Sequence, residues 1–306
     1  MTACPGCGKP SDGWHSICLK RLFGRSELPD ISNICNSDMS ELALQSVGRL
    51  SISGVQVKLA VEYEKNKIIT GGVKGSRYIL KPSVPQWRGM PQNENLIMSF
   101  AQVAGIEIPP HGLLKNSRNE SFYIVKRFDR TGTGSRIHIE DFCQAGNVPR
   151  DMKYRKSAEF CGKLIQKVTT FPKIETQKFF RLVLFNFLVG NGDAHLKNYS
   201  FMYLKNRTVL TPAYDLVSSS ILIPGETASA ITINGKDNKF RLKDFKALAS
   251  NMKIPELQVN LFIKLLLDNL PSFFQMIEVA EFNAEMKEGL VNLIKQRAQV
   301  LSGGSI

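Results

Sequence analysis

Long apolar runs are missing from this chain of 306 residues. Its most apolar stretch is interrupted by Arg181 and falls short of the roughly 18 residues that a membrane-spanning helix requires. The opening residues MTACPGCGKP also lack the charged and then apolar pattern of a secretory signal. We therefore expect a soluble cytoplasmic protein with no membrane partner, and these features leave export to a host open.

Cysteines and acidic residues are both scarce. The six cysteines are too few and too unevenly spaced for the disulfide framework of a small secreted protein, so we expect them to be reduced. Asp and Glu total 27 against 40 Lys and Arg, which gives a formal net charge of +13. Such a surface attracts polyanions, including nucleic acid and nucleotides, but a merely solvated basic surface has the same composition. No G-K-[ST] sequence occurs, which excludes a Walker A loop.

Hydrophobic periodicity divides the chain into a front half rich in strands and a helical back half, an α+β fold. Residues 1–50 form a cysteine-containing segment with a short helix, which begins at Ser37 or Asp38. Within residues 51–130, VQVKLAV at 55–61 alternates apolar and polar side chains, and FYIVKRFD at 122–129 is a further predicted strand, so we expect a small antiparallel sheet. A helix is predicted within this part from Asn93 to Ala104.

Residues 131–306 are predicted to be mostly helical. Thr176–Val189 is apolar nearly all round, which indicates a buried central helix. A compact hairpin follows over residues 199–210, with its turn at Lys205 and Asn206. The last segment, residues 256–301, predicts two amphipathic helices broken near Pro271.

A polar loop follows the buried helix, in the sequence VGNGDAHLKNYSF at 189–201. The hairpin after it leads to Asp215, so two acidic residues are expected in one region. Phosphoryl transfer needs one carboxylate to orient the attacking hydroxyl and further oxygen ligands to hold Mg²⁺ against ATP. Asp193 would be the catalytic base, and Asn198 and Asp215 the metal ligands. The alternative is that these residues only form turns and helix caps.

The order D-x-H-x-x-N, which includes His195, resembles lipid kinases more than the H-R-D order of protein kinases. We also count His195 among the residues that contact the cofactor.

The front half supplies candidate residues for nucleotide binding. Lys81 ends the predicted strand RYILK, as a phosphate-pairing lysine would, and Glu94 in the first turn of the next helix would be its ion-pair partner. The segment from Lys126 to Phe128 would be a hinge whose backbone meets adenine, and Asp129 would reach the ribose. The alternatives are a solvated lysine and a plain edge strand.

Two glycines, Gly48 and Gly54, bracket the serines Ser51 and Ser53. Small residues allow backbone amides to approach phosphates closely, although an ordinary turn explains the same pattern.

Seven segments resemble, in the same order, segments of the HipA family of bacterial toxin Ser/Thr kinases. They are SISGVQVKLA, YILKPS, NENLIMSFAQVAGI, YIVKRFDR, IHIEDFCQ, LVGNGDAHLKNYSF and LTPAYDLV. The resemblance covers about Ser51 to the C-terminus. It implies a two-lobed protein-kinase-like fold with a β-rich N-lobe at 51–130 and a helical C-lobe at 131–306. It also implies ATP and Mg²⁺, and phosphorylation of an aminoacyl-tRNA synthetase, which inhibits translation.

The family roles extend to matching positions of this chain. Lys81 would contact ATP phosphates, Asp193 would be the catalytic acid and base, and Asn198 and Asp215 would bind Mg²⁺. The resemblance also implies autophosphorylation at Ser51 or Ser53. A phosphate there would repel the ATP phosphates that the loop should cover, which would inhibit the kinase.

The stretch before the SISG loop is about half as long as in full-length HipA. The chain thus resembles HipT, the kinase of three-component systems, which implies two antitoxin partners. One is a small protein similar to the absent HipA N-terminal subdomain, and the other is a helix-turn-helix protein that would connect the complex to DNA. The HipT resemblance favours tryptophanyl-tRNA synthetase as the substrate.

The first 18 residues bring together the pattern C-x2-C-x7-H-x2-C, formed by Cys4, Cys7, His15 and Cys18. These are four ligand types of a tetrahedral zinc site, but the spacing of the second pair is unusual. The sequence favours a small packing cluster beneath Trp14, Leu22 and Phe23, because free cysteine behaves as a small apolar residue.

Two functions other than a toxin kinase remain compatible with the sequence. A catalytically silent protein that binds DNA or a repressor complex would use the basic surface, and its DNA binding would be sensitive to salt. A small-molecule or lipid kinase would explain the D-x-H-x-x-N order.

Overall fold

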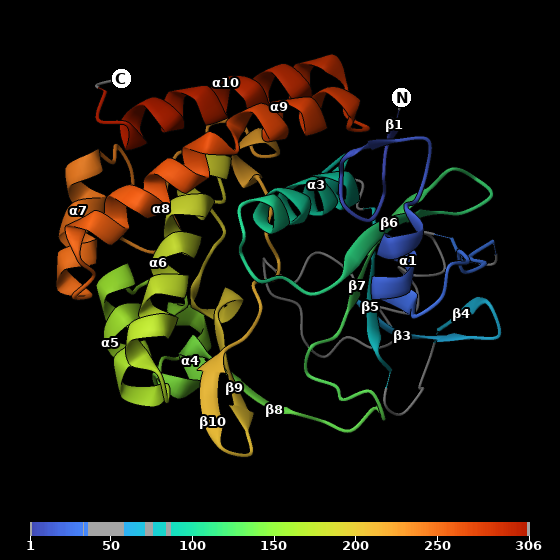
Figure 1. Ribbon diagram of the computed structural model, residues 1–306, viewed down its shortest axis with the longest axis horizontal. Helices are drawn as coiled ribbons and strands as arrows, with labels where there is room; N and C mark the ends of the chain where they lie inside the picture. The colour runs from blue at the N-terminus through green and yellow to red at the C-terminus, as the bar shows by residue number, and fades with distance from the viewer. Residues whose placement is uncertain (1, 33, 36–57, 71–75, 84–86, 305–306) are drawn as a thin grey trace. The chain divides into compact units, whose positions relative to one another are not determined.

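The computed structural model describes residues 2–32, 34–35, 58–70, 76–83 and 87–304 (Figure 1). The chain forms two compact units. Unit 1 contains Met1–Phe100, Pro109–Arg136 and Gln275–Phe282, and unit 2 contains Ala101–Ile108, Ile137–Phe274 and Asn283–Ile306. The helix predicted after residue 36 and the serines Ser51 and Ser53 lie outside the described residues.

The described part of unit 1 is built on a five-stranded antiparallel sheet with the order β4-β3-β5-β7-β6. Its strands are β3 Leu59–Glu64, β4 Lys67–Thr70, β5 Tyr78–Pro82, β6 His111–Lys115 and β7 Ser121–Lys126. The predicted antiparallel sheet is therefore confirmed. Because side chains alternate along a strand, Tyr78 and Leu80 face one side of the sheet and Lys81 faces the other.

Each face of this sheet is covered by one helix (Figure 1). Helix α1, Ser16–Phe23, packs on the face of Tyr78, with the Phe23 ring 5.7 Å from the Tyr78 ring. The Tyr78 hydroxyl donates to the Leu22 carbonyl at 3.1 Å. Helix α3, Met90–Val103, contacts the opposite face through Glu94, which pairs with Lys81.

Two helices in unit 1 differ from the prediction. Helix α1 was not predicted at all, because eight residues are too few for a local pattern to decide, and packing on the sheet stabilises it. Helix α3 begins at Met90, three residues before the predicted start, and includes Pro91. A proline is tolerated in the first turn because the amide it lacks would have no partner within the helix.

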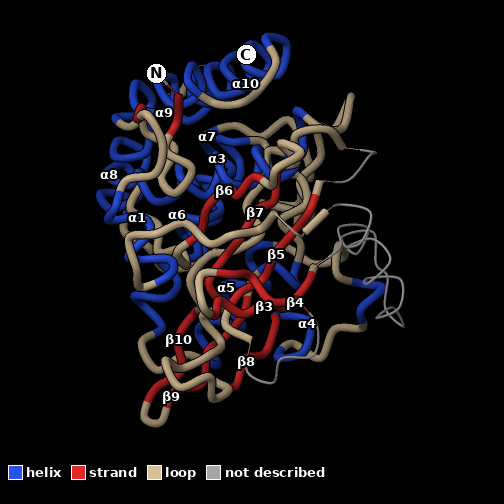
Figure 2. The backbone as a smooth tube through the Cα atoms, turned by 90° about the vertical axis from the view of Figure 1, so that its right-hand side faces the viewer, coloured by secondary structure: helices blue, strands red, loops and turns tan. Residues whose placement is uncertain are grey.

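Unit 2 is mostly helical and also holds a three-stranded sheet of order β10-β9-β8 (Figure 2). The strands are β8 His138–Asp141, β9 Ser200–Leu204 and β10 Arg207–Leu210. The main helices are α5 Ala158–Val168, α6 Pro172–Val189, α7 Leu242–Asn251, α8 Glu256–Asp268 and α10 Ala284–Leu301. Shorter elements are α4 Phe142–Ala145, η2 Arg150–Met152, η3 Leu196–Asn198 and η4 Ser219–Ile221.

The central helix and the hairpin of unit 2 agree with the sequence. Most side chains of α6 are buried, as expected for a helix that is apolar nearly all round. It starts at Pro172, four residues before the predicted start, and ends at Val189 as predicted. Gly190, which follows, has a left-handed φ of +74°. β9 and β10 pair through a turn at Lys205 and Asn206.

The prediction of two helices over residues 256–301 is wrong, because this segment forms three. Helix α8 ends at Asp268, and α9 occupies Leu270–Val279 with Pro271 in its first turn. A second interruption precedes α10, where the Asn283 side chain accepts from the Met286 amide at 2.8 Å. Asparagine is a strong N-cap residue, and Asn283 therefore marks a helix start that the amphipathic pattern alone does not show.

None of the helices in the described ranges combines the length and the apolar character that crossing a membrane requires.

A buried histidine in unit 1 should make stability depend on pH. The His111 side chain is 3% exposed and its Nδ1 lies 3.0 Å from Asn95 Oδ1. Burial, and to a lesser degree the charge of Arg21, lowers its pKa to about 3. Between pH ~6.5, the ordinary histidine pKa, and pH about 3, the unfolded chain binds a proton that the folded chain does not. The free energy of unfolding should therefore fall with decreasing pH, by up to ~1.4 kcal/mol per unit from this group.

The His111→Gln variant should lose this part of the pH dependence. We would measure denaturant unfolding between pH 7.5 and 5 for the native chain and the variant. His138→Gln is the matched control, because the His138 side chain is 67% exposed and should leave the slope unchanged. Equal slopes for the native chain and His111→Gln would contradict the prediction.

Candidate functional site

The polar loop that follows α6 is held by backbone and side-chain contacts to its own helix. Gly190 ends the helix in the left-handed conformation, and the Asn191 amide donates to the Asn186 carbonyl at 2.9 Å. The Asn191 side chain also donates to Asn186 Oδ1 at 3.1 Å. The direction in which the chain leaves the helix is therefore defined by the conformation of Gly190 and by two hydrogen bonds from Asn191 to Asn186.

Gly192 lies at a position where only glycine fits. A Cβ atom there would lie 2.6 Å from a Glu226 carboxylate oxygen and 2.8 Å from the Ala228 carbonyl. The Gly192 amide donates to the Ser219 hydroxyl at 2.7 Å, and the Ser220 amide donates to the Gly190 carbonyl at 3.1 Å. The short helix η4 thus supports the loop immediately before Asp193.

Asp193 is partly exposed and its orientation is set by a tyrosine. The Tyr154 hydroxyl donates to Asp193 Oδ1 at 2.6 Å. Burial, then the hydrogen bond to Asp193 and its negative charge, raises the pKa of Tyr154 well above its usual value, so this hydroxyl stays protonated and remains a donor. The Asp193 carbonyl accepts from the His195 amide at 2.7 Å.

His195 is buried beneath this carboxylate and contacts a lysine. Its Nε2 lies 2.9 Å from Lys153 Nζ. Burial lowers the pKa of His195, and the charge of Lys153 lowers it further, so the ring is neutral and Nε2 accepts from the ammonium group. The negative charges of Asp193 and Asp215 act in the opposite direction on the same imidazole.

Asp215 reaches this region on a second segment of the chain. Its φ of +54° is left-handed, a conformation that few residues other than glycine adopt and that aspartate tolerates better than most. The preceding Tyr214 hydroxyl donates to the Lys197 carbonyl at 2.9 Å and shares a hydrogen bond with the Ser200 hydroxyl at 2.6 Å. Tyr214 therefore fixes the segment of Asp215 to the loop that carries Asn198.

The three predicted side chains Asp193, Asn198 and Asp215 are all partly exposed and offer only oxygen donors of the kind that Mg²⁺ prefers. Mg²⁺ takes only a few ligands from the protein when phosphates and water supply the others. Two carboxylates and one amide oxygen match that small number. The donor chemistry of unit 2 thus fits a magnesium ion bound with a nucleotide.

Unit 1 contains the predicted ion pair in a fully buried form. Lys81 Nζ lies 2.5 Å from Glu94 Oε1, and their side chains are only 3% and 1% exposed. Lys81 Nζ also lies 5.4 Å from the centre of the Tyr123 ring. Glu94 occupies the second turn of α3 and not the predicted first turn, because the helix starts at Met90.

The segment from Lys126 to Asp129 is engaged in contacts within unit 1. The backbone amides of Lys126 and Arg127 donate to the carbonyls of Pro110 and Arg77, both at 2.8 Å. An adenine contact from residues 126–128, including Phe128, would therefore have to use other backbone groups. Burial opposes ionisation of Asp129, but hydrogen bonds from Arg127 and the charges of Arg127 and Arg130 outweigh it and lower its pKa. Its contact with ribose stays a prediction.

Three residues around the loop were missed by the sequence analysis, namely Lys153, Tyr154 and Tyr214. Lys153 and Tyr154 lie in an irregular stretch after η2, where no periodicity marks them. Tyr214 directly precedes Asp215, but adjacency does not reveal that its hydroxyl reaches Lys197. Only the contacts of the folded chain identify these residues.

Comparison with known proteins shows what this chain is similar to. The sequence profile of the HipA-like C-terminal domain matches residues 50–273. A protein of Sinorhizobium fredii named "Putative kinase Y4dM" is 31% identical over 271 residues, which are 82% of this chain and 64% of that protein. The "Serine/threonine-protein kinase toxin HipA" of Shewanella oneidensis is 31% identical over 206 residues, which are 61% of this chain and 47% of that protein. The chain thus spans between about half and two thirds of these relatives.

Solved structures share the fold. HipA in the complex of the Shewanella oneidensis HipA–HipB toxin–antitoxin system with its operator DNA superimposes with a TM-score of 0.71 and 23% identity, covering 88% of this chain and 72% of that one. The Helicobacter pylori proinflammatory kinase CtkA superimposes with a TM-score of 0.54 and 15% identity, covering 79% of this chain and 93% of that one. The predicted kinase-like fold class is therefore confirmed.

Proposed function

Because the chain belongs to the family with a HipA-like C-terminal domain, we propose that it is an ATP-dependent kinase that phosphorylates serine or threonine residues of a protein. One observation carries this proposal. Tyr214 fixes the segment of Asp215 to the loop that carries Asp193 and Asn198, because its hydroxyl donates to the Lys197 carbonyl of that loop. Phosphoryl transfer depends on this kind of arrangement, because positioning and charge stabilisation account for most of its catalysis.

Asp193 would act as the catalytic base. Its carboxylate would accept the proton of the attacking hydroxyl, while the hydrogen bond from Tyr154 holds one of its oxygens in place. Lys153 lies near Asp193, and the carboxylate in turn opposes the lowering of the Lys153 pKa that burial causes.

The remaining residues would hold the nucleotide. Asn198 and Asp215 would bind Mg²⁺, which when bound neutralises charge on the phosphates. Lys81 would contact ATP phosphates, and its ion pair with Glu94 would keep the ammonium group in one orientation. His195 would remain neutral, and its contact with Lys153 would help to position the loop that carries Asp193.

We propose an aminoacyl-tRNA synthetase as the substrate, with the tryptophanyl enzyme as the first candidate, and autophosphorylation at Ser51 or Ser53. The resemblance of the sequence to HipA-type kinases supports both. We also propose a helix-turn-helix antitoxin and a small antitoxin as partners, with DNA bound through the complex. The HipA of Shewanella oneidensis was solved with HipB and operator DNA, which supports a partner of the first kind.

Incubation of the purified chain with labelled ATP, Mg²⁺ and a bacterial lysate tests the proposal. We expect one labelled synthetase band, which purified tryptophanyl-tRNA synthetase should reproduce, and no label with the Asp193→Asn variant. Label only in lipids or small molecules would instead identify a small-molecule or lipid kinase. The absence of ATP turnover, together with salt-sensitive DNA binding that Asp193→Asn leaves unchanged, would identify a catalytically silent binding protein.

A further inference from the structure

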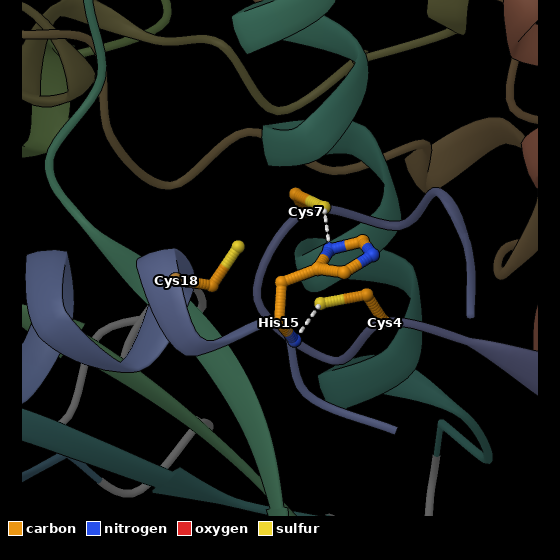
Figure 3. Close-up of side chains that lie close together, drawn as sticks. All are labelled: Cys4, Cys7, His15 and Cys18. Atoms are coloured by element: carbon orange, nitrogen blue, oxygen red, sulfur yellow. Dashed lines mark hydrogen bonds between the residues drawn. The ribbon is translucent and has the colours of Figure 1, made fainter. Parts of the chain in front are cut away.

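Four side chains near the start of the chain converge on one point in unit 1. The sulfur atoms of Cys4, Cys7 and Cys18 and one ring nitrogen of His15 all lie within 4.8 Å of one another (Figure 3). Cys7 Sγ lies 3.4 Å from His15 Nδ1. In a tetrahedral zinc site with Zn–S of about 2.3 Å and Zn–N of about 2.0 Å, sulfur and nitrogen ligands are about 3.5 Å apart and two sulfurs about 3.8 Å. The four ligand atoms are therefore close to zinc-binding positions.

The first two ligands come from a tight turn between two paired strands. Strands β1, Thr2–Ala3, and β2, Pro10–Ser11, are antiparallel, and the Cys4 amide donates to the Lys9 carbonyl at 2.7 Å. The Gly8 amide donates to the Cys4 carbonyl at 2.8 Å, and Gly8 has a left-handed φ of +69°. This turn brings the Cys7 thiol to the ring of His15 and the Cys4 thiol to its backbone amide (Figure 3).

The other two ligands come from the start of helix α1. His15 is the N-cap residue, and Cys18 lies in the first turn. The His15 amide donates to Cys4 Sγ at 3.3 Å, a contact of the kind that supports a metal-bound thiolate.

A packing cluster alone does not explain this arrangement. Leu22 and Phe23 are buried in the sheet core with Tyr78, and apolar packing gives no reason for an imidazole to meet three sulfur atoms. No disulfide joins the cysteines, all six of which lie in the described residues. Cys4 and Cys18 are buried, and Cys7 and His15 are partly exposed, so an ion could enter.

We propose that Cys4, Cys7, His15 and Cys18 bind one structural zinc ion. Four protein ligands leave no open position for a substrate, which is the pattern of structural and not catalytic zinc. The site joins the hairpin to α1, and the Pro5 carbonyl of the turn accepts from the Leu113 amide of β6 at 3.0 Å. The ion would therefore stabilise the attachment of the N-terminal segment to the sheet that carries Lys81. The proposal does not depend on kinase activity.

The metal content of the purified chain tests this site directly. We expect one zinc ion per chain after dialysis, measured by mass spectrometry of the metal, and its loss in the Cys4→Ser/Cys7→Ser double variant. Cys35→Ser is the matched control, because Cys35 is also a buried cysteine of unit 1 but lies outside the cluster. It should retain the full zinc content. A chelator should lower the unfolding temperature of the native chain and of Cys35→Ser.

A second measurement keeps the test valid if the double variant does not fold. Titration of the zinc-free native chain with Co²⁺ should give the visible bands of a tetrahedral ion and the near-ultraviolet band of thiolate ligands. His15→Cys should retain metal with a stronger thiolate band, whereas His15→Ala should bind it more weakly. The proposal is overturned if a chain produced with zinc contains none and shows no cobalt bands, or if the double variant retains the metal.

Discussion

The Asp193→Asn variant should transfer phosphate roughly a thousandfold more slowly than the native chain, the loss typical of removing a catalytic base. An amide cannot take up the proton of the attacking hydroxyl at neutral pH. Its Oδ1 can still accept the hydrogen bond from Tyr154, which the native carboxylate accepts at 2.6 Å, so the loop should keep its position. The rate of label transfer from ATP to the synthetase or to the chain itself measures the effect.

A matched control separates this loss from a general effect of removing a negative charge. Asp268 pairs with Lys264 on the surface of α8, and its side chain is 53% exposed. The Asp268→Asn variant should therefore keep its activity. The free energy of unfolding of both variants should stay within about 0.5 kcal/mol of the native value. A fully active Asp193→Asn variant would remove Asp193 from the catalytic role.

The Lys81→Met variant should lose both stability and activity. Lys81 and Glu94 form a buried ion pair, so removal of the ammonium group leaves a buried carboxylate without its ion-pair partner. Breaking such a pair costs ~3–5 kcal/mol of unfolding free energy. Loss of a positive charge at the ATP phosphates should lower the rate by a further factor of roughly 10² to 10³. Denaturant unfolding and the phosphate-transfer assay measure the two effects separately.

The double variant Lys81→Met/Glu94→Gln distinguishes the structural role of Lys81 from its catalytic role. It removes both charges, so most of the lost stability should return, but activity should not. Lys115→Met is the control, because Lys115 pairs with Glu281 at 2.7 Å with both side chains about two fifths exposed. Such an exposed pair contributes less than about 1 kcal/mol. Recovery of activity in the double variant would contradict contact between Lys81 and ATP.

Elements with a strong local pattern could be predicted from the sequence. The strand β7 follows from a short run of aromatic and β-branched residues, and the buried helix α6 from a longer stretch that is apolar nearly all round. The β9–β10 hairpin follows from its turn residues. Weak or short patterns failed. Helix α1 has only eight residues, and the capping asparagine that separates α9 from α10 was hidden within an amphipathic run. The boundaries of such helices depend on contacts with residues outside the short window in which a periodicity is read.

The candidate site shows the same division. Asp193, Asn198, Asp215, Lys81 and Glu94 could be named from residue type and order, because phosphoryl transfer requires oxygen ligands, a base and a positive charge. Their supporting residues could not be named. Lys153 and Tyr154 reach the loop from about forty positions away in the chain, and no local signal marks a residue whose role depends on a distant contact.

The residue types available for chemistry, several strands, the buried helix α6 and the order of the segments shared with the family could all be identified in the amino-acid sequence. Which of these residues meet became visible only in the fold. It buried Lys81 against Glu94, connected Asp215 to the polar loop through Tyr214, and brought four metal-ligand side chains together at the N-terminal hairpin. The physical reason is that periodicity and turn chemistry act over a few residues, whereas burial, ion pairing and metal coordination depend on distances between atoms that the chain brings together only when it folds.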